Sequence, residues 1–293
     1  MSEIVAIIPA YNEEAGIGSI ILRTQQYVDR IIVVDDGSVD KTVDVVKLTN
    51  VELIQHHKNK GKGEALKSAF ALLNDDDIVV TIDADGQHNP DEIPNLLKPI
   101  LDQEADIVNG SRYLTGTDEN TPHYRRVGQK VLDKATNFAS GIDLTDSQSG
   151  FRAFSSRSIG AFNFNESGFA VESEMIADAS QACLKIIEVP IKVRYDVGTS
   201  TKNPVVHGVK VLSDIVRDIE LKRPLYFFTL PGIIITFIGL AMSLMFARDY
   251  LTGRSINFEP TAMAVLLAFV GGFLVLTGII LDTIRRLLKN NNI

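Results

Sequence analysis

The sequence is poor in cysteine, tryptophan and basic residues, and these shortages exclude several classes of protein. Cys183 is the single cysteine among 293 residues, which excludes an internal disulfide framework and any multi-cysteine metal site. Because it lies in the apolar stretch Ala182-Cys183-Leu184, we expect the thiol to pack in the core rather than to act as a nucleophile. Acidic residues outnumber basic ones, 37 to 29, and the net charge of −8 disfavours a nucleic-acid-binding protein, which needs a basic face.

Long apolar runs are missing from the N-terminus and occur only after residue 224. Met1-Ser2-Glu3-Ile4 starts neither a basic segment nor a long apolar run, so no signal peptide is expected. Residues 225–247 and 261–281 are uncharged, mainly apolar, and long enough to cross a bilayer core, which needs about 20 residues. A short polar loop joins them. The pattern predicts a transmembrane hairpin, the alternative being a hairpin buried in a protein core.

Basic residues predict how this hairpin is oriented. The two flanks of the hairpin carry more of them than the loop does: Lys222, Arg223, Arg285, Arg286 and Lys289 against Arg248 and Arg254. The positive-inside rule therefore places the large N-terminal part in the cytoplasm of a cell, at its membrane. Residues 205–223 have an apolar helical stripe with basic neighbours, typical of an amphipathic helix on a membrane surface or on the domain itself. We expect a domain over 1–204, this helix over 205–223 and the hairpin over 224–293.

The first 110 residues alternate between strand-like and helix-like segments. Five short apolar runs rich in branched side chains are separated by segments with helical spacing, and a sixth run follows later: 4–9, 30–35, 51–54, 77–82, 105–108 and 186–193. Further helices are expected over 127–140 and 170–182. Such alternation predicts an α/β domain with a mostly parallel, Rossmann-like sheet covered on both faces.

Acidic loops follow three of these predicted strands. They are Pro9-Ala10-Tyr11-Asn12-Glu13-Glu14, Asp35-Asp36-Gly37-Ser38 and Asp83-Ala84-Asp85-Gly86-Gln87-His88. Ligands of such sheets bind beyond the carboxyl ends of the strands, so we expect the three loops to form one site. The fragment Gly16-Ile17-Gly18 lacks the third glycine of a dinucleotide fingerprint, which disfavours a Rossmann oxidoreductase.

The third loop has the chemistry of a divalent metal site. Asp83 and Asp85, two residues apart at a strand end, offer the oxygen ligands that Mg²⁺ and Mn²⁺ prefer, and Gln87 adds a neutral oxygen. His88 is expected to support the loop rather than to bind the metal. A solvated turn is the usual explanation of such a motif on its own. Asp35 likewise has two interpretations, as a turn and cap residue and as a hydrogen-bond acceptor for a base or ribose.

Taken in order, these motifs resemble the family 2 glycosyltransferases of the GT-A fold. Three further motifs share this resemblance: Asn59-Lys60-Gly61-Lys62-Gly63, Gly110-Ser111-Arg112-Tyr113 and the run from Asp146 to Phe154. Together with the three loops, the similarity extends over about residues 3–202. The sequence is most similar to the dolichol-phosphate mannose synthases and related polyprenyl-phosphate sugar synthases. A GT-A domain with a C-terminal transmembrane hairpin is therefore expected.

The resemblance implies roles for individual residues. It implies that the nucleoside is contacted by Pro9, Tyr11, Glu13, Asp35 and Asp83. It also implies that the metal is bound by Asp83, Asp85 and Gln87. Basic contacts to the acceptor or its phosphate fall to Arg112, Arg125, Arg126, Arg194 and Lys202. Asp85, Arg112 and Arg126 are implied in catalysis. The Lys202 match is offset by one residue, because the family's Gly-x-Ser-Lys run is here Gly198-Thr199-Ser200-Thr201-Lys202.

The implied activity is metal-dependent, inverting transfer of one sugar from a nucleotide-sugar to dolichyl or another polyprenyl phosphate. The product would supply lipid-linked sugar for protein glycosylation or cell-surface glycans. Departures over 198–208 from the mannose-transferring pattern favour UDP-linked N-acetylglucosamine or glucose over GDP-mannose. Processive transferases of the family usually carry a Gln-x-x-Arg-Trp motif, and this sequence has no tryptophan. Two alternatives stay open: transfer to a neutral lipid or glycan hydroxyl, and a non-catalytic membrane scaffold.

Overall fold

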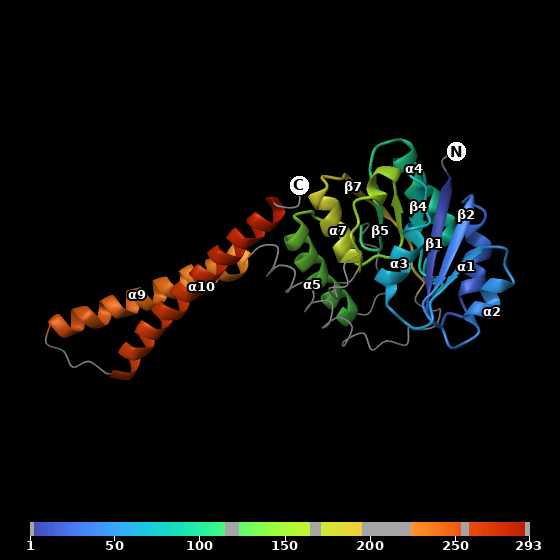
Figure 1. Ribbon diagram of the computed structural model, residues 1–293. Helices are drawn as coiled ribbons and strands as arrows, with labels where there is room; N and C mark the ends of the chain where they lie inside the picture. The colour runs from blue at the N-terminus through green and yellow to red at the C-terminus, as the bar shows by residue number, and fades with distance from the viewer. Residues whose placement is uncertain (1–2, 115–122, 165–170, 195–223, 253–257, 291–293) are drawn as a thin grey trace. The chain divides into compact units, whose positions relative to one another are not determined.

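A computed structural model of the chain describes residues 3–114, 123–164, 171–194, 224–252 and 258–290 (Figure 1). The chain divides into two compact units, Met1–Ile215 and Val216–Ile293. The expected amphipathic helix over 205–223 lies outside the described residues, so the boundaries at 204 and 223 stay predictions.

The first unit contains a seven-stranded sheet in the order β3-β2-β1-β4-β6-β5-β7. Its strands are β1 (Ile4–Ala10), β2 (Arg30–Asp35), β3 (Glu52–Gln55), β4 (Ile78–Thr81), β5 (Ile107–Ser111), β6 (Arg152–Phe154) and β7 (Ile186–Pro190). Pairing is parallel except at β6, which runs antiparallel to both β4 and β5. The expected mostly parallel α/β sheet is confirmed, and β6 is an addition that the apolar pattern did not predict.

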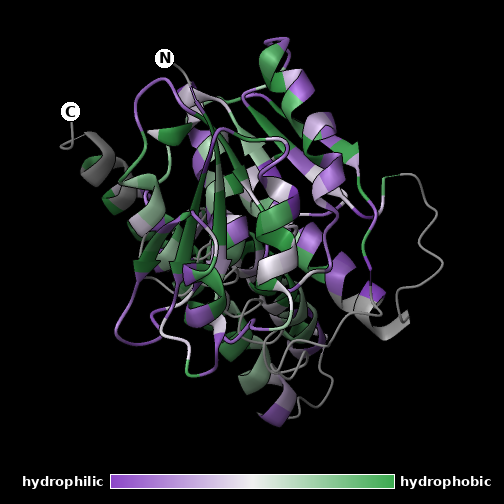
Figure 2. Cartoon of the chain, turned by 90° about the vertical axis from the view of Figure 1, so that its right-hand side faces the viewer, coloured by the Kyte–Doolittle hydropathy of each residue, from purple (hydrophilic) through white to green (hydrophobic). Residues whose placement is uncertain are grey.

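Side chains along each strand alternate between the two faces of the sheet, so a hydrophobic core forms on each face. Ile8 and Val33 face a cluster that includes the buried sides of α1 (Ile17–Thr24), α2 (Thr42–Lys47) and α4 (Ile93–Leu101). Ile7 and Ile32 face the opposite cluster, built with α3 (Lys62–Phe70) and α7 (Val171–Gln181). Successive side chains of a strand point to opposite faces, so a strand apolar throughout is buried on both. Figure 2 shows the apolar strands between the more polar loops.

Three further helical segments lie in the described part of this unit. The helix α5 (His123–Ser140) lies beside α7, where the hydroxyls of Thr136 and Ser173 are 3.0 Å apart. The short helix α6 (Ser156–Ile159) follows β6, and a 3₁₀ turn, η1 (Pro90–Glu92), precedes α4. The expected helices over 127–140 and 170–182 are thereby confirmed.

The expectation for Cys183 was wrong, because its side chain is exposed. Helix α7 ends at Gln181, and Cys183 has a left-handed backbone with φ of 54°. The N–H of Leu184 then donates to the carbonyl of Ala179 at 3.0 Å. This is the arrangement of a helix C-cap, which turns one residue toward solvent and buries the next. Leu184 is the buried residue here.

The second unit is a helical hairpin whose outer surface is apolar. A π-helical segment, η2 (Leu225–Thr229), leads into α9 (Leu230–Leu251), and α10 (Phe258–Asn290) returns. Within Leu225–Leu251 and Glu259–Ile284 the most apolar 18-residue windows have mean hydropathies of 2.1 and 2.7, so both helices are long and apolar enough to cross a membrane. Phe237 and Phe269 are 73% and 79% exposed, whereas a core hairpin of a water-soluble protein would bury such side chains.

Glycines allow the two helices of the hairpin to pack closely. A methyl group on Gly271 of α10 would overlap Thr236 of α9 and lie 2.7 Å from the carbonyl oxygen of Gly232, whereas one on the adjacent Gly272 would meet nothing within 4 Å. Small residues at helix contacts are typical of membrane-spanning helices, because backbone packing replaces the hydrophobic effect there.

This contrast predicts opposite results for two neighbouring substitutions. We expect Gly271→Ala to lower the melting temperature of the detergent-solubilised protein, since overpacking costs about 1–3 kcal/mol. The control, Gly272→Ala, should leave the melting temperature unchanged or raise it, because alanine favours a helix over glycine by about 1 kcal/mol. Circular dichroism melts of both variants make the measurement. Equal melting temperatures for the two would contradict the helix contact.

Candidate functional site

The loops after β1 and β2 are joined by hydrogen bonds. The N–H of Asn12 donates to Ser38 Oγ at 2.9 Å, and the N–H of Val39 donates to Asn12 Oδ1 at 2.9 Å. The N–H of Glu13 donates to Thr42 Oγ1 at 2.8 Å. Asn12 has a φ of 56°, a backbone region that asparagine tolerates better than most residues. These bonds fix Glu13 beside the end of β2, as the sequence predicted.

Asp35 and Asp36 are both buried, but they accept hydrogen bonds from different loops. Asp35 accepts the N–H of Ser38 at 3.2 Å, which agrees with its interpretation as a turn residue. Asp36 accepts the N–H groups of Lys60 at 2.9 Å and Gly61 at 2.7 Å, and His56 Nδ1 lies 2.8 Å from it. Asp36 therefore fixes the loop before α3. Neither Asp36 nor His56 was among the predicted site residues.

Asp83 follows β4 and forms the centre of an ionic cluster. Its Oδ1 is 2.5 Å from Lys62 Nζ, which also lies 2.8 Å from Glu172 Oε1. His88 Nε2 is 3.8 Å from Asp83 Oδ2, and the buried His88 ring lies against Phe151 at 5.3 Å between centroids. His88 thus supports the loop, as expected. Asp85 accepts the backbone N–H of Gln87 at 3.0 Å.

The pKa values at this edge of the sheet show an excess of negative charge. Burial, and then the charges of Asp85 and Asp83, raise the pKa of Glu13 to about 7. Burial and the charge of Asp83 raise the pKa of Asp85 to about 6. Burial is the largest single influence on Asp83 and raises its pKa, but the charge and hydrogen bond of Lys62, together with other nearby charges that include Arg112, outweigh burial and lower the pKa of Asp83. Burial lowers the pKa of His88 to about 4, so its imidazole is neutral.

The donor set at Asp83 and Asp85 suits a divalent cation. Two carboxylates that hinder each other's ionisation are stabilised by a shared cation, and oxygen ligands are what Mg²⁺ and Mn²⁺ prefer. Across the described ranges, no group of three or more His, Cys, Asp and Glu side chains is arranged to hold a metal. A cation here would take its remaining ligands from substrate phosphates and water, as Mg²⁺ commonly does.

Arg112 and Arg126 lie around one tyrosine. Arg112 follows β5 and donates from Nε and Nη2 to the two oxygens of the fully buried Asp146, both at 2.7 Å. The guanidinium carbons of Arg112 and Arg126 lie 5.3 Å and 3.9 Å from the centroid of the Tyr113 ring. The Arg112 charge also acts on Asp83 and Asp85. The charge of Arg112 therefore acts on the predicted metal ligands, and Arg112, paired with a fully buried carboxylate, is not an ordinary surface ion pair.

The other three predicted basic contacts are Arg125, Arg194 and Lys202. The side chain of Arg125 and all of Lys202 lie outside the described residues. Arg194 is exposed, and its backbone N–H donates to the carbonyl of Gln87 at 2.9 Å. That bond brings Arg194 next to the predicted metal loop.

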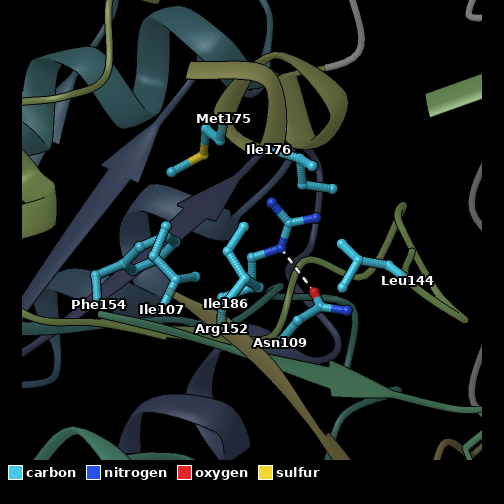
Figure 3. A pocket seen from close by; sticks show the side chains of 8 residues that line it. All are labelled: Ile107, Asn109, Leu144, Arg152, Phe154, Met175, Ile176 and Ile186. Carbon is cyan, nitrogen blue, oxygen red and sulfur yellow. Dashed lines mark hydrogen bonds between the residues drawn. The ribbon is translucent and has the colours of Figure 1, made fainter. Parts of the chain in front are cut away.

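A buried arginine that the sequence analysis did not single out fixes the surroundings. Arg152 of β6 is 3% exposed and donates to Asn109 Oδ1 at 2.9 Å, to the carbonyl of Ser147 at 2.7 Å and to that of Glu172 at 3.0 Å. Figure 3 shows Arg152 and Asn109 in a small pocket that is otherwise apolar. None of the acidic-loop residues lines this pocket, so it is separate from the carboxylate edge.

Asp133 of α5 supports the loop that carries Asp146. It accepts both the backbone N–H of Ser147 at 2.8 Å and its hydroxyl at 2.7 Å. Burial raises the pKa of Asp133 to about 6. The folded chain therefore binds this proton more tightly than the unfolded chain. The resulting stability is fully present below the ordinary carboxyl pKa of about 4 and is lost as pH rises through about 6.

We expect Asp133→Asn to remove this pH dependence, since asparagine keeps an acceptor oxygen without the charge. The melting temperature of the variant should exceed that of the parent protein at about pH 7.5 by about 2–8 °C, with a smaller or no gain at about pH 4. The exposed Asp76→Asn is the control. The same gain at both pH values would contradict the buried titration. Melting curves at the two pH values decide the question.

Comparisons with known proteins agree with this geometry. The family model described as glycosyl transferase family 2 matches residues 5–161. The UDP-N-acetylglucosamine–dolichyl-phosphate N-acetylglucosaminyltransferase of Methanococcus voltae is 37% identical, over 66% of this chain and 86% of its own. The dolichol-phosphate mannosyltransferase of Pyrococcus furiosus is 31% identical, over 64% of this chain and 55% of its own.

A solved structure shows the same fold. The glucosyl-3-phosphoglycerate synthase of Mycobacterium tuberculosis, crystallised with Mg²⁺ and UDP, aligns with a TM-score of 0.57 and 25% identity, covering 74% of this chain and 79% of its own. The resemblance found in the sequence motifs is confirmed, and so are the expected GT-A fold and enzyme class. This chain belongs to glycosyl transferase family 2 and is a glycosyltransferase.

Proposed function

We propose that this glycosyltransferase transfers a single sugar from a nucleotide-sugar to dolichyl or another polyprenyl phosphate at the cytoplasmic surface of a membrane. The observation that supports the proposal is the placement of two charged groups: the carboxylates of Glu13, Asp83 and Asp85, and the two guanidinium groups around Tyr113, of which Arg112 acts on the charges of Asp83 and Asp85. A donor pyrophosphate with its cation suits the first group, and an anionic acceptor suits the second.

On the donor side, the nucleoside lies against Pro9, Tyr11, Glu13 and Asp35. Tyr11 is 36% exposed, so its ring is accessible for stacking on a base, whereas Asp35 is fully buried, so a nucleoside contact with it requires its loop to rearrange. Asp83, Asp85 and Gln87 would hold Mg²⁺ or Mn²⁺. Such a cation, when bound, stabilises the negative charge that develops on the departing nucleoside diphosphate.

On the acceptor side, Arg112 and Arg126 bind the lipid phosphate, assisted by Arg125, Arg194 and Lys202. A phosphate monoester is already anionic near neutral pH, so its oxygen can attack without a strong general base. The bond between the anomeric carbon and the acceptor oxygen forms as the bond to the nucleoside diphosphate breaks. A single displacement of this kind inverts the anomeric configuration.

The hairpin would anchor the enzyme in the bilayer that holds such an acceptor. A polyprenyl chain stays in the bilayer, so only its phosphate reaches a water-exposed site, and an anchored enzyme meets it at the membrane surface. Support comes from the two apolar helices and from the relatives named for transfer to dolichyl phosphate. The donor we favour is UDP-linked N-acetylglucosamine or glucose, and GDP-mannose is the next choice.

The donor and the metal are tested together. Membranes containing the full-length enzyme are incubated with a polyprenyl phosphate and radiolabelled UDP-N-acetylglucosamine, UDP-glucose or GDP-mannose. We expect one donor to label the lipid, and a chelator to abolish the labelling until Mg²⁺ or Mn²⁺ is restored. Labelling of a neutral lipid alone, or labelling that persists in the chelator, would contradict the proposal.

The acceptor phosphate is tested by charge reversal on α5. We expect Arg126→Glu to lower kcat/KM for the polyprenyl phosphate by roughly 10- to 100-fold, because hydrogen bonds to charged groups contribute about 1.5–3 kcal/mol. The matched control is Lys130→Glu, an exposed cation one helical turn further along α5, which should change kcat/KM little. An Arg126→Glu enzyme with unchanged kcat/KM would favour a neutral acceptor instead.

A further inference from the structure

Lys62 is a cation held against the predicted metal ligand Asp83. It is the first residue of α3 and comes from a part of the chain other than the two carboxylates that it contacts. Lys62 Nζ lies 2.5 Å from Asp83 Oδ1 and 2.8 Å from Glu172 Oε1. The side chains are only partly accessible, at 30% for Lys62, 28% for Asp83 and 16% for Glu172. Ion pairs this shielded are screened little by salt.

The backbone at Gly150 lies close against this ion pair. A methyl group added to Gly150 would lie 2.6 Å from Lys62 Nζ and would overlap the Asp83 carboxylate. Gly150 is fixed in turn, because its carbonyl accepts the Thr81 hydroxyl at 2.9 Å. The absence of a side chain at residue 150 is therefore what allows the ammonium and the carboxylate to meet.

Glu172 provides a second place for the same ammonium. It lies in the first turn of α7, and its carbonyl oxygen accepts from the buried Arg152 at 3.0 Å. Glu172 is thus anchored independently of Lys62. A cation arriving at Asp83 would repel the ammonium, and Glu172 would keep it within the site rather than releasing it to solvent.

We infer that Lys62 is the resident counter-ion of the donor site: it occupies Asp83 while no divalent cation is bound, and it passes wholly to Glu172 when one binds. Lys62 is a positioning residue in this role, since it acts through Asp83. The inference rests on the proposed function in one respect, the divalent cation at Asp83. Its consequence is that the nucleotide-free enzyme binds Mn²⁺ weakly, because the metal must first displace a bound ammonium.

The test is the affinity for Mn²⁺ alone, measured by electron paramagnetic resonance on the full-length protein in detergent without nucleotide. We expect Lys62→Met to bind Mn²⁺ roughly 5- to 150-fold more tightly than the parent protein, the usual range for two coupled sites. Lys60→Met removes the same charge from an exposed side chain two residues away and should leave the affinity unchanged. Glu172→Gln should weaken Mn²⁺ binding, because Lys62 then has only Asp83 as a partner.

Opposite changes in the two variants exclude simple damage to the site, which would weaken Mn²⁺ binding in both. Unchanged or weaker binding in Lys62→Met would overturn the inference. Should that variant not fold, Glu172→Gln decides, and tighter Mn²⁺ binding there would overturn it. Mn²⁺ binding by the parent protein with a nucleoside diphosphate separates the two proposals. If the parent protein binds no Mn²⁺ even with a nucleoside diphosphate, the metal site itself is refuted. If it binds Mn²⁺ and Lys62→Met has no effect, only the counter-ion role of Lys62 is refuted.

Discussion

Repulsion among carboxylates at one edge of the sheet is the constraint on which the rest of this structure depends. A parallel sheet brings the loops after β1 and β4 to the same edge, and here those loops carry Glu13, Asp83 and Asp85. Burial weakens the solvation of each charge, so the pKa values of Glu13 and Asp85 rise to about 7 and about 6. The folded chain therefore has a site with excess negative charge, which a bound cation would stabilise.

The structure compensates this charge with cations from distant parts of the chain. Lys62 pairs with Asp83, while Arg112 is held by the buried Asp146. Arg152 carries no ligand-facing role; it binds the carbonyls of Ser147 and Glu172 and so fixes the segments that hold the other two cations. The proposed reaction needs this arrangement, since a donor, a cation and an anionic acceptor would all add charge within a few ångströms of one another.

The sheet and the hairpin could be predicted from the sequence because their signals are local. Apolar runs gave the parallel strands, and two uncharged stretches gave the hairpin helices. Strand β6 has only three residues, and its pairing with β4 and β5 depends on long-range contacts. The pairing of Lys62 with Glu172 joins residues far apart in sequence, which no motif encodes. Cys183 was misjudged because a left-handed helix end, rather than its apolar neighbours, determines its exposure.

We expect this carboxylate edge to bind a nucleotide only together with a divalent cation. Isothermal titration of the full-length protein with UDP and with GDP, in a chelator and then in Mn²⁺, measures that dependence directly. One of the two nucleotides should bind at least about tenfold more tightly in Mn²⁺ than in the chelator, a coupling of about 1.4 kcal/mol. Equal affinity under both conditions, for the nucleotide that binds, would contradict it.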